Sequence, residues 1–285
     1  MKICRFKYRE GEVRVGVVND DATLLDLTPA GVTRLEPLLE GGDIVARLRQ
    51  IAQPTLPRVP LDRVRLCAPV ERQEVWAAGV TYLRSKTERM AESNFSATAY
   101  DRVYEAERPE IFFKALAEKV AATGQEAGIR RDAKWNVPEP ELALVFNSAG
   151  TLVGHTIGND MSSRDIEGEN LLYLPQAKTY RRSCALGPWI TLGADEAEAR
   201  QWTIRLEIRR GGKTVFEDKT SVSQIKRGFA ELADYLFRSQ EFPHGVVLLT
   251  GTGIVPAAPF TLEARDWVGI EITGIGLLEN TVAVV

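Results

Sequence analysis

The amino-acid sequence predicts a mainly β protein with some α-helix (α+β), divided into a small N-terminal module and a larger second part. Most of its apolar runs are short and are separated by glycine, proline or charged residues, which is the pattern of strands joined by turns. Few stretches show the apolar spacing of an amphipathic helix. A segment punctuated by prolines, residues 54–60, separates the two parts, so we place the domains at residues 1–68 and 69–285.

The N-terminal module is expected to be a small α+β unit. Its candidate strands are residues 3–7, 13–17 and 24–27. Residues 35–51 have helical spacing, although the pair Gly41-Gly42 weakens the middle of that segment. No motif that carries chemistry is visible in this module, and packing or assembly is the role that we expect for it.

In the larger part, strands dominate. Residues 75–80 and 111–113 read as buried strands, and residues 203–209 alternate between apolar and polar side chains before a hairpin turn at 210–213. Residues 225–237 have one apolar helical face. Further strands are expected at residues 246–249, 268–273 and 277–285.

A long polar segment with helical character, residues 81–107, follows directly after one of the buried strands. Solvated surface helices would have this composition. A mobile lid over a functional site would have it too. Both interpretations remain open from the sequence.

The composition excludes two classes of partner. A formal net charge of −3 gives no electrostatic reason to bind nucleic acid or an anionic membrane, and no apolar run is long enough to span a bilayer. Residues 1–5 do not open a signal peptide, because no apolar stretch follows them. The cysteines Cys4, Cys67 and Cys184 are odd in number and far apart, which favours free thiols in a reducing compartment. We therefore expect a cytoplasmic protein.

Three acidic side chains, Glu139, Glu141 and Asp160, stand out in the centre of the chain, with little basic charge near them in the sequence. If residues 139–146 form a strand, both glutamates point to one face. The run is apolar on both faces, so we expect the strand to be covered on both sides. Asp160 ends a second apolar stretch, residues 151–160, and a hairpin would bring it beside the two glutamates.

Carboxylates on a covered face need a cation between them. A site made of carboxylates alone favours a hard ion, Mg²⁺ first and then Mn²⁺ or Ca²⁺. The histidines His155 and His244 show no ligand spacing. From the E-x-E motif alone, a solvated acidic rim at a strand end remains an open alternative.

The turn Thr250-Gly251-Thr252-Gly253 follows a short buried strand. Its backbone N–H groups and hydroxyls are able to hold an oxyanion. An ordinary tight turn would have the same sequence, and both interpretations remain open.

Several motifs together resemble the fumarylacetoacetate hydrolase superfamily over residues 70–285. They are P-E-P-E-L-A (138–143), G-x-x-x-G-N-D-x-S-x-R-D (154–165), L-Y-L-P-Q-x-K (172–178), L-G-P-W (186–189) and T-G-T (250–252). The resemblance implies a mixed β-sandwich roll with a divalent metal ion at its centre. It also implies a homo-oligomer, either a dimer or a tetramer.

R-P-E-I-F-F-K-A (108–115) together with L-Y-L-P-Q-x-K-x-Y (172–180) is similar to the members of this superfamily that dehydrate 2-keto-3-deoxy sugar acids. This resemblance implies metal-dependent conversion of a 2-keto-3-deoxypentonate, the arabinonate or the xylonate derivative, to 2-oxoglutarate semialdehyde in non-phosphorylative pentose breakdown. The metal would polarise the keto group of the small-molecule substrate, while a base and an acid transfer protons.

The resemblance carries functional roles to particular residues of this chain. Glu139, Glu141 and Asp160 are the implied metal ligands, and Lys178 and Glu110 are the implied catalytic residues. The expected substrate contacts are Thr252, Gln176, Lys114 and Tyr82.

A hydrolase of acylpyruvates or related diketo acids is the alternative function. Many hydrolases of the superfamily carry a histidine, paired with a glutamate, soon after the first strand, to activate water. Residues 79–85 contain no histidine, which favours dehydration, although Glu88 or Glu92 would offer a substitute base. A non-catalytic scaffold of the same fold is a third interpretation, and the intact acidic residues with Lys178 argue against it.

Overall fold

The computed structural model describes residues 1–8, 11–83 and 102–285. Within this part of the chain, eleven strands form one large sheet, in the order β4-β3-β2-β1-β13-β11-β10-β16-β6-β7, with β5 paired to β1. The pairs are antiparallel except for β16 and β6, which are parallel. Their bounds are β1 Lys2–Lys7, β2 Arg14–Val18, β3 Thr23–Asp26, β4 Arg58–Pro60, β5 Arg65–Cys67, β6 Glu74–Gly79, β7 Glu110–Ala115, β10 Pro140–Phe146, β11 Leu152–Asp160, β13 Cys184–Leu192 and β16 Val246–Leu249.

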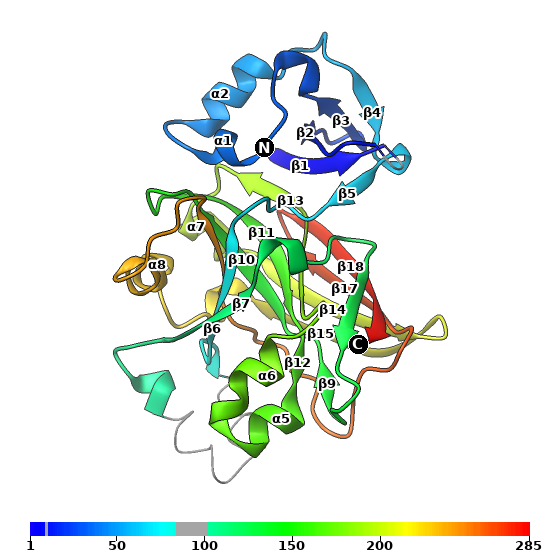
Figure 1. Cartoon of the computed structure of the whole chain (residues 1–285), viewed down its shortest axis with the longest axis vertical. Coiled ribbons are helices and arrows are strands. Elements are labelled where there is room, and N and C mark those ends of the chain that lie inside the picture. Colours follow the sequence, from blue (N-terminus) through cyan, green and yellow to red (C-terminus); the bar gives the residue numbers. More distant parts are fainter. Residues whose placement is uncertain (9–10, 84–101) are drawn as a thin grey trace.

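A second sheet of five described strands has the order β15-β14-β17-β18-β8. Its strands are β8 Glu126–Ile129, β14 Thr203–Arg210, β15 Lys213–Ser221, β17 Trp267–Ile272 and β18 Gly276–Val284. A short ribbon pairs β9 (Asn136–Val137) with β12 (Ser162–Ser163). Figure 1 shows this ribbon with α5 (Arg164–Glu169) and α6 (Leu174–Lys178) at the end of the molecule opposite the N-terminal module.

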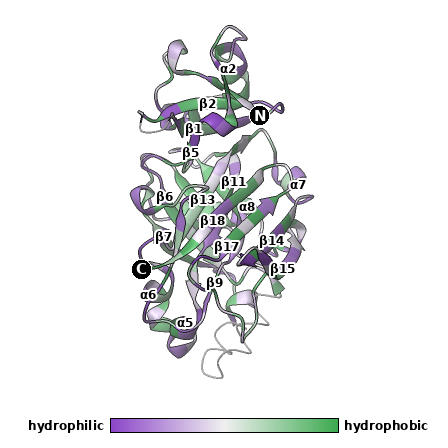
Figure 2. Ribbon diagram, turned by 90° about the vertical axis from the view of Figure 1, so that its right-hand side faces the viewer, coloured by the Kyte–Doolittle hydropathy of each residue, from purple (hydrophilic) through white to green (hydrophobic). Residues whose placement is uncertain are grey.

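The apolar core fills the space on both faces of β10. Leu142, Leu144 and Phe146 belong to a buried cluster that includes β14 and helix α8 (Phe229–Phe237). Ala143 and Val145 point to the opposite face and pack in a second cluster with residues of the N-terminal module. Every residue of β10 is buried, which confirms the prediction of a strand covered on both sides. Figure 2 shows the hydrophobic segments on strands of both sheets.

The N-terminal module is joined to the rest of the protein through the large sheet. Strand β1 pairs with β2 inside the module and with β13 of the larger part, where Ile3 lies opposite Ile190. The remaining helical elements of the module are η1 Thr28–Ala30, α1 Glu36–Leu39, α2 Ile44–Ile51 and η2 Leu61–Arg63. In its described residues the larger part also contains η3 Ala117–Lys119, η4 Leu171–Tyr173, α7 Glu196–Ala199 and η5 Val222–Gln224.

Two predicted helices differ from the structure. The segment 35–51 is two helices, α1 and α2, because Gly41 and Gly42 both have positive φ angles and interrupt it. Helix α8 begins at Phe229, so Ile225 lies before the helix, although it is buried in the same cluster. Most of the segment 81–107 lies outside the described residues, so the choice between a surface helix and a lid stays open. Among the described residues, no helix is long and apolar enough to cross a membrane.

Candidate metal centre and active site

The antiparallel pairing of β10 with β11 brings the three predicted carboxylates together. Glu139 directly precedes β10, Glu141 is its second residue, and Asp160 ends β11. The backbone N–H of Asp160 donates to the carbonyl of Glu139 at 2.9 Å. Each carboxylate offers one oxygen within 4.8 Å of the others. The side chains are buried, so the alternative of a solvated acidic rim is wrong.

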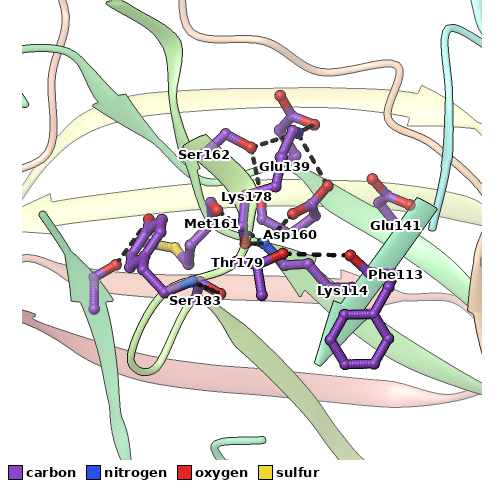
Figure 3. Close-up of polar contacts among 12 residues, drawn as sticks. Phe113, Lys114, Glu139, Glu141, Asp160, Met161, Ser162, Lys178, Thr179 and Ser183 are labelled. Atoms are coloured by element: carbon purple, nitrogen blue, oxygen red, sulfur yellow. Dashed lines mark hydrogen bonds and ion pairs between the residues drawn. The ribbon is translucent and has the colours of Figure 1, made fainter. Parts of the chain in front are cut away.

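Lys178, at the end of α6, reaches into the middle of this cluster (Figure 3). Its ammonium donates to Glu139 Oε2 at 2.8 Å, to Asp160 Oδ2 at 3.0 Å and to the hydroxyl of Ser162 at 2.6 Å. The side chain is fully buried. The predicted catalytic lysine therefore lies in direct contact with two of the predicted metal ligands.

Two further buried cations contact the same carboxylates. Lys114 of β7 forms an ion pair with Asp160 Oδ1, and Arg164 of α5 pairs with Glu139 Oε1 at 2.6 Å. The sequence pattern indicated little basic charge near the acidic residues, and this was wrong for the folded chain. Lys114 is distant in sequence and is brought in by the position of β7. Arg164 and Ser162 belong to the N-D-x-S-x-R-D motif, which was the available signal for their place at the site.

Glu141 has the least compensated carboxyl group of the cluster. Burial raises its pKa well above the usual range, and the negative charges of Asp160 and Glu139 raise it further. Two groups act in the opposite direction and lower this pKa. They are Lys178 and the backbone N–H of Gly251, which donates to Glu141 Oε2 at 2.6 Å. A divalent cation among the three carboxylates would compensate the charge that burial penalises. The donor set, made of oxygens only, fits a hard ion such as Mg²⁺.

The turn after β16 is held against the carboxylates. Gly251 has a φ of +91°, and a Cβ there would lie 2.1 Å from Thr81 Oγ1. The hydroxyl of Thr81 donates to the carbonyl of Thr250 at 2.6 Å. Thr252 is buried, and its hydroxyl donates to the carbonyl of Ile254 at 3.0 Å. The turn is therefore fixed from both sides, and a substrate contact of Thr252 stays a prediction.

Tyr82 is also buried beside this turn. Its ring lies so close to Gly253 that a Cβ on the glycine would be 2.5 Å from it. Burial raises the pKa of the phenol, and the charge of Glu141 raises it further. In the described part of the chain the hydroxyl has no hydrogen-bond partner. Its predicted role as a substrate contact is untested.

Glu110, the predicted second catalytic residue, begins β7 and lies opposite Gly79 of β6. A Cβ at Gly79 would meet Glu110 Oε2 at 2.0 Å, so the carboxylate covers the glycine. Glu110 also lines a cavity of about 310 Å³, together with Arg108, Glu167, Leu171 and others. Its catalytic role stays a prediction.

Gln176 lies two residues before Lys178 on α6 and is exposed. Its backbone carbonyl accepts a hydrogen bond from Arg130 at 3.0 Å. Among the described residues no contact links its side chain to the three carboxylates, and its predicted substrate contact stays untested.

Comparison with known protein families gives the site its context. The model of the fumarylacetoacetate hydrolase C-terminal domain matches residues 74–283, which is most of the chain. The chain belongs to the fumarylacetoacetate hydrolase family. A second model, described as Rv2993c-like N-terminal, matches residues 1–69. The family assignment confirms the resemblance inferred from the motifs and the mainly β, mixed-sheet fold that it implied.

Relatives of the family match this chain over nearly its whole length. A protein of Haloferax volcanii, named probable 2-keto-3-deoxyxylonate dehydratase, is 40% identical over 96% of this chain and 97% of its own. The 2-dehydro-3-deoxy-D-arabinonate dehydratase of Saccharolobus solfataricus is 36% identical over 98% of this chain and 95% of its own.

A solved member of the family has the same fold. It is described as 2-keto-3-deoxy-D-arabinonate dehydratase complexed with magnesium and 2,5-dioxopentanoate. It superposes with a TM-score of 0.84 at 32% identity, covering 100% of this chain and 99% of that one. The fold that positions the carboxylates here is therefore also the fold of a family member solved with a divalent metal.

Proposed function

We propose that this protein is a metal-dependent dehydratase that converts a 2-keto-3-deoxypentonate to 2-oxoglutarate semialdehyde. The observation that carries the proposal is the position of Lys178, whose ammonium lies within 3.0 Å of two of the three clustered carboxylates. Proton-transfer chemistry and an oxygen-only metal site are thereby combined in one buried place. The relatives at 36% and 40% identity carry the names of dehydratases for such sugar acids.

Glu139, Glu141 and Asp160 would hold the metal, with Mg²⁺ as the first choice and Mn²⁺ or Ca²⁺ as possible replacements. The ion, when bound, would polarise the keto group of the substrate and stabilise negative charge on that oxygen. Lys178, Lys114 and Arg164 pair with Glu139 and Asp160, whereas the carboxyl group of Glu141 accepts a hydrogen bond from the backbone N–H of Gly251. The ion would therefore compensate the charge of Glu141, and it would attract the negatively charged substrate.

Lys178 and Glu110 are the proposed proton-transfer residues. Lys178, in the neutral form that the charge of a bound divalent ion would favour, would remove a proton from C3, and a protonated Glu110 would donate its proton to the C4 hydroxyl as it leaves as water. Loss of a C5 proton and tautomerisation then complete the semialdehyde, so that the net change is the loss of one water molecule. Thr252, Gln176 and Tyr82 are the proposed substrate contacts.

The two alternatives from the sequence are less well supported. The hydrolase interpretation lacks a histidine near residues 79–85, and the full-length relatives carry dehydratase names. The scaffold interpretation leaves the buried acidic cluster with its lysine without a purpose.

A cytoplasmic location and a homo-oligomer, dimer or tetramer, are part of the proposal. The free cysteines Cys4, Cys67 and Cys184 are consistent with a reducing compartment. No nucleic acid or membrane partner is proposed. Light scattering on the purified protein measures the oligomeric state directly.

The function is tested by a turnover assay with 2-keto-3-deoxyarabinonate and 2-keto-3-deoxyxylonate, each with Mg²⁺ and with a chelator. We expect semialdehyde formation that depends on the metal, and the rates will rank the two sugar acids. In parallel, Glu141→Ala should lower metal affinity by more than about 100-fold while the protein stays folded. Glu271→Gln, at an exposed position of β17, is the control.

Cleavage of an acylpyruvate without any dehydration would move the protein to the hydrolases. Full activity of Glu141→Ala at trace metal would remove the metal from the mechanism.

A further inference from the structure

The ammonium of Lys114 contacts Asp160, the same carboxylate that the ammonium of Lys178 contacts. The side chain is fully buried. It forms the ion pair with Asp160 Oδ1, donates to the carbonyl of Met161 at 3.0 Å and donates to the backbone carbonyl of Lys178. Figure 3 shows the side chain directed toward Asp160 and the end of α6.

We propose that Lys114 is a positioning residue that sets the geometry of Asp160 and Lys178 relative to each other. The inference rests on the proposed function. It differs from the substrate contact predicted from the sequence, because the buried ammonium donates to two backbone carbonyls and its charge pairs with Asp160. The described polar contacts of this side chain are all made with the protein.

The first effect of Lys114 is on the Asp160 carboxylate. Lys114 contacts Oδ1, whereas Lys178 contacts Oδ2. A carboxylate held at both oxygens cannot rotate about its terminal bond. Asp160 therefore presents a fixed orientation toward Glu139 and Glu141, as a metal ligand of defined geometry requires.

The second effect is on the backbone that carries Lys178. The last carbonyl groups of a helix have no partners within the helix, and Lys114 satisfies the one that belongs to Lys178. The next residue is tied to the same strand, because the hydroxyl of Thr179 donates to the carbonyl of Phe113 at 3.3 Å. Strand β7 thus fixes the point from which the Lys178 side chain extends.

Lys114→Met removes these interactions while keeping a long unbranched side chain. We expect kcat for the sugar acid to fall by about 10- to 100-fold, as is typical when the support of a metal ligand is lost. KM should stay within about threefold, since the proposed substrate contacts are untouched. Lys119→Met, at an exposed position on the same segment, is the matched control.

A second readout does not depend on the substrate. Mn²⁺ is bound to the wild type and to the variants, and its electron paramagnetic resonance spectrum is compared. Reorientation of Asp160 should change the spectrum in Lys114→Met but not in Lys119→Met. If Lys114→Met fails to fold, Lys114→Gln, which keeps two N–H donors, is measured in the same way with the same expected changes.

A raised KM with unchanged kcat and an unchanged Mn²⁺ spectrum would overturn the proposal and return Lys114 to a substrate contact. An unchanged kcat, KM and spectrum would overturn it as well. A wild type that binds Mn²⁺ but does not dehydrate either sugar acid would refute the proposed function, while the spectra would still test the role of Lys114.

Discussion

Two titratable side chains on the paired strands β10 and β11, Glu141 and His155, illustrate opposite consequences of burial. Glu141 is buried among charges, and its carboxyl pKa is raised by desolvation and by two neighbouring acids. His155 is buried among aromatic rings, with Trp202 at a centroid distance of 5.4 Å and Phe229 at 6.1 Å. In the described part of the chain neither imidazole nitrogen has a hydrogen-bond partner. The first environment suits a metal ion, and the second suits a neutral ring in the core.

The burial of His155 predicts a loss of stability in mild acid. Burial lowers the pKa of the imidazole from 6.5 to about 4, so the unfolded chain takes up a proton before the folded one. The free energy of unfolding is therefore unaffected by this group above pH 6.5 and falls as the pH drops from 6.5 to about 4. By linkage the loss amounts to about 3 kcal/mol. Denaturant unfolding of the wild type and of His155→Phe across this range measures it.

Buried carboxylates also titrate in acid. The contribution of His155 is therefore the difference between the free energies of unfolding of the wild type and of His155→Phe, each measured as a function of pH. The variant should lose stability less steeply than the wild type between pH 6.5 and 4. Parallel curves would show that the imidazole does not contribute.

Short-range sequence patterns predicted many of the individual elements. The strands at β10, β11, β14 and β16 follow from apolar or alternating runs, and the hairpin of β10 with β11 placed Asp160 beside Glu139 and Glu141 as expected. Helix limits were predicted less well. Spacing alone extended one helix across Gly41-Gly42 and started another four residues too early, because apolar residues before a helix can pack on the same core.

The turn after β16 is the element whose conformation depends most on a single residue. Gly251→Ala places a side chain at positive φ and within 2.1 Å of Thr81 Oγ1 and 2.9 Å of the Ala78 carbonyl. We expect destabilisation of about 2–4 kcal/mol, from backbone strain and overpacking together. The N–H that donates to Glu141 should shift as well, which lowers metal affinity.

Gly211→Ala is the control for this substitution, because Gly211 also has positive φ (57°) but open space around its Cβ position. Gly211→Ala should be destabilised only by the backbone strain, about 1–2 kcal/mol, and should keep its metal affinity. Thermal melting and Mn²⁺ titration measure both effects. Equal losses of stability and of metal affinity in Gly251→Ala and Gly211→Ala would show that the close contacts of Gly251 are unimportant.

At the scale of the whole molecule, the arrangement of the strands could not be read from local patterns. Sheet neighbours such as β1 with β13, or β16 with β6, are far apart in the chain. The contact of Lys114 with Asp160 could not be predicted from local patterns either, because it depends on where β7 lies in the sheet. The grouping of the three carboxylates was predictable because they belong to one hairpin, whereas the cations around them come partly from elsewhere.

The division at residue 68 stays a prediction, and the shared sheet suggests how to test it. Removal of residues 1–68 leaves β13 without its β1 partner and uncovers the apolar face formed by Val145, Val247 and their neighbours. We expect the fragment 69–285 to aggregate or to melt well below the full chain. Size-exclusion chromatography and thermal melting of both proteins decide this. A monodisperse fragment that melts with the full chain would identify the N-terminal module as an independent appendage.

The balance of charges at the site also has a consequence for the ionic conditions under which the protein can work. Dissolved ions screen charges over about 8 Å at physiological ionic strength, but they act on groups that water reaches. The side chains of Lys114, Lys178 and Arg164 and their acidic partners, Glu139 and Asp160, are shielded from solvent and form ion pairs with one another. Their geometry is therefore insulated from the salt concentration of the surroundings. A buried site of this kind keeps its geometry in saline and in dilute surroundings alike.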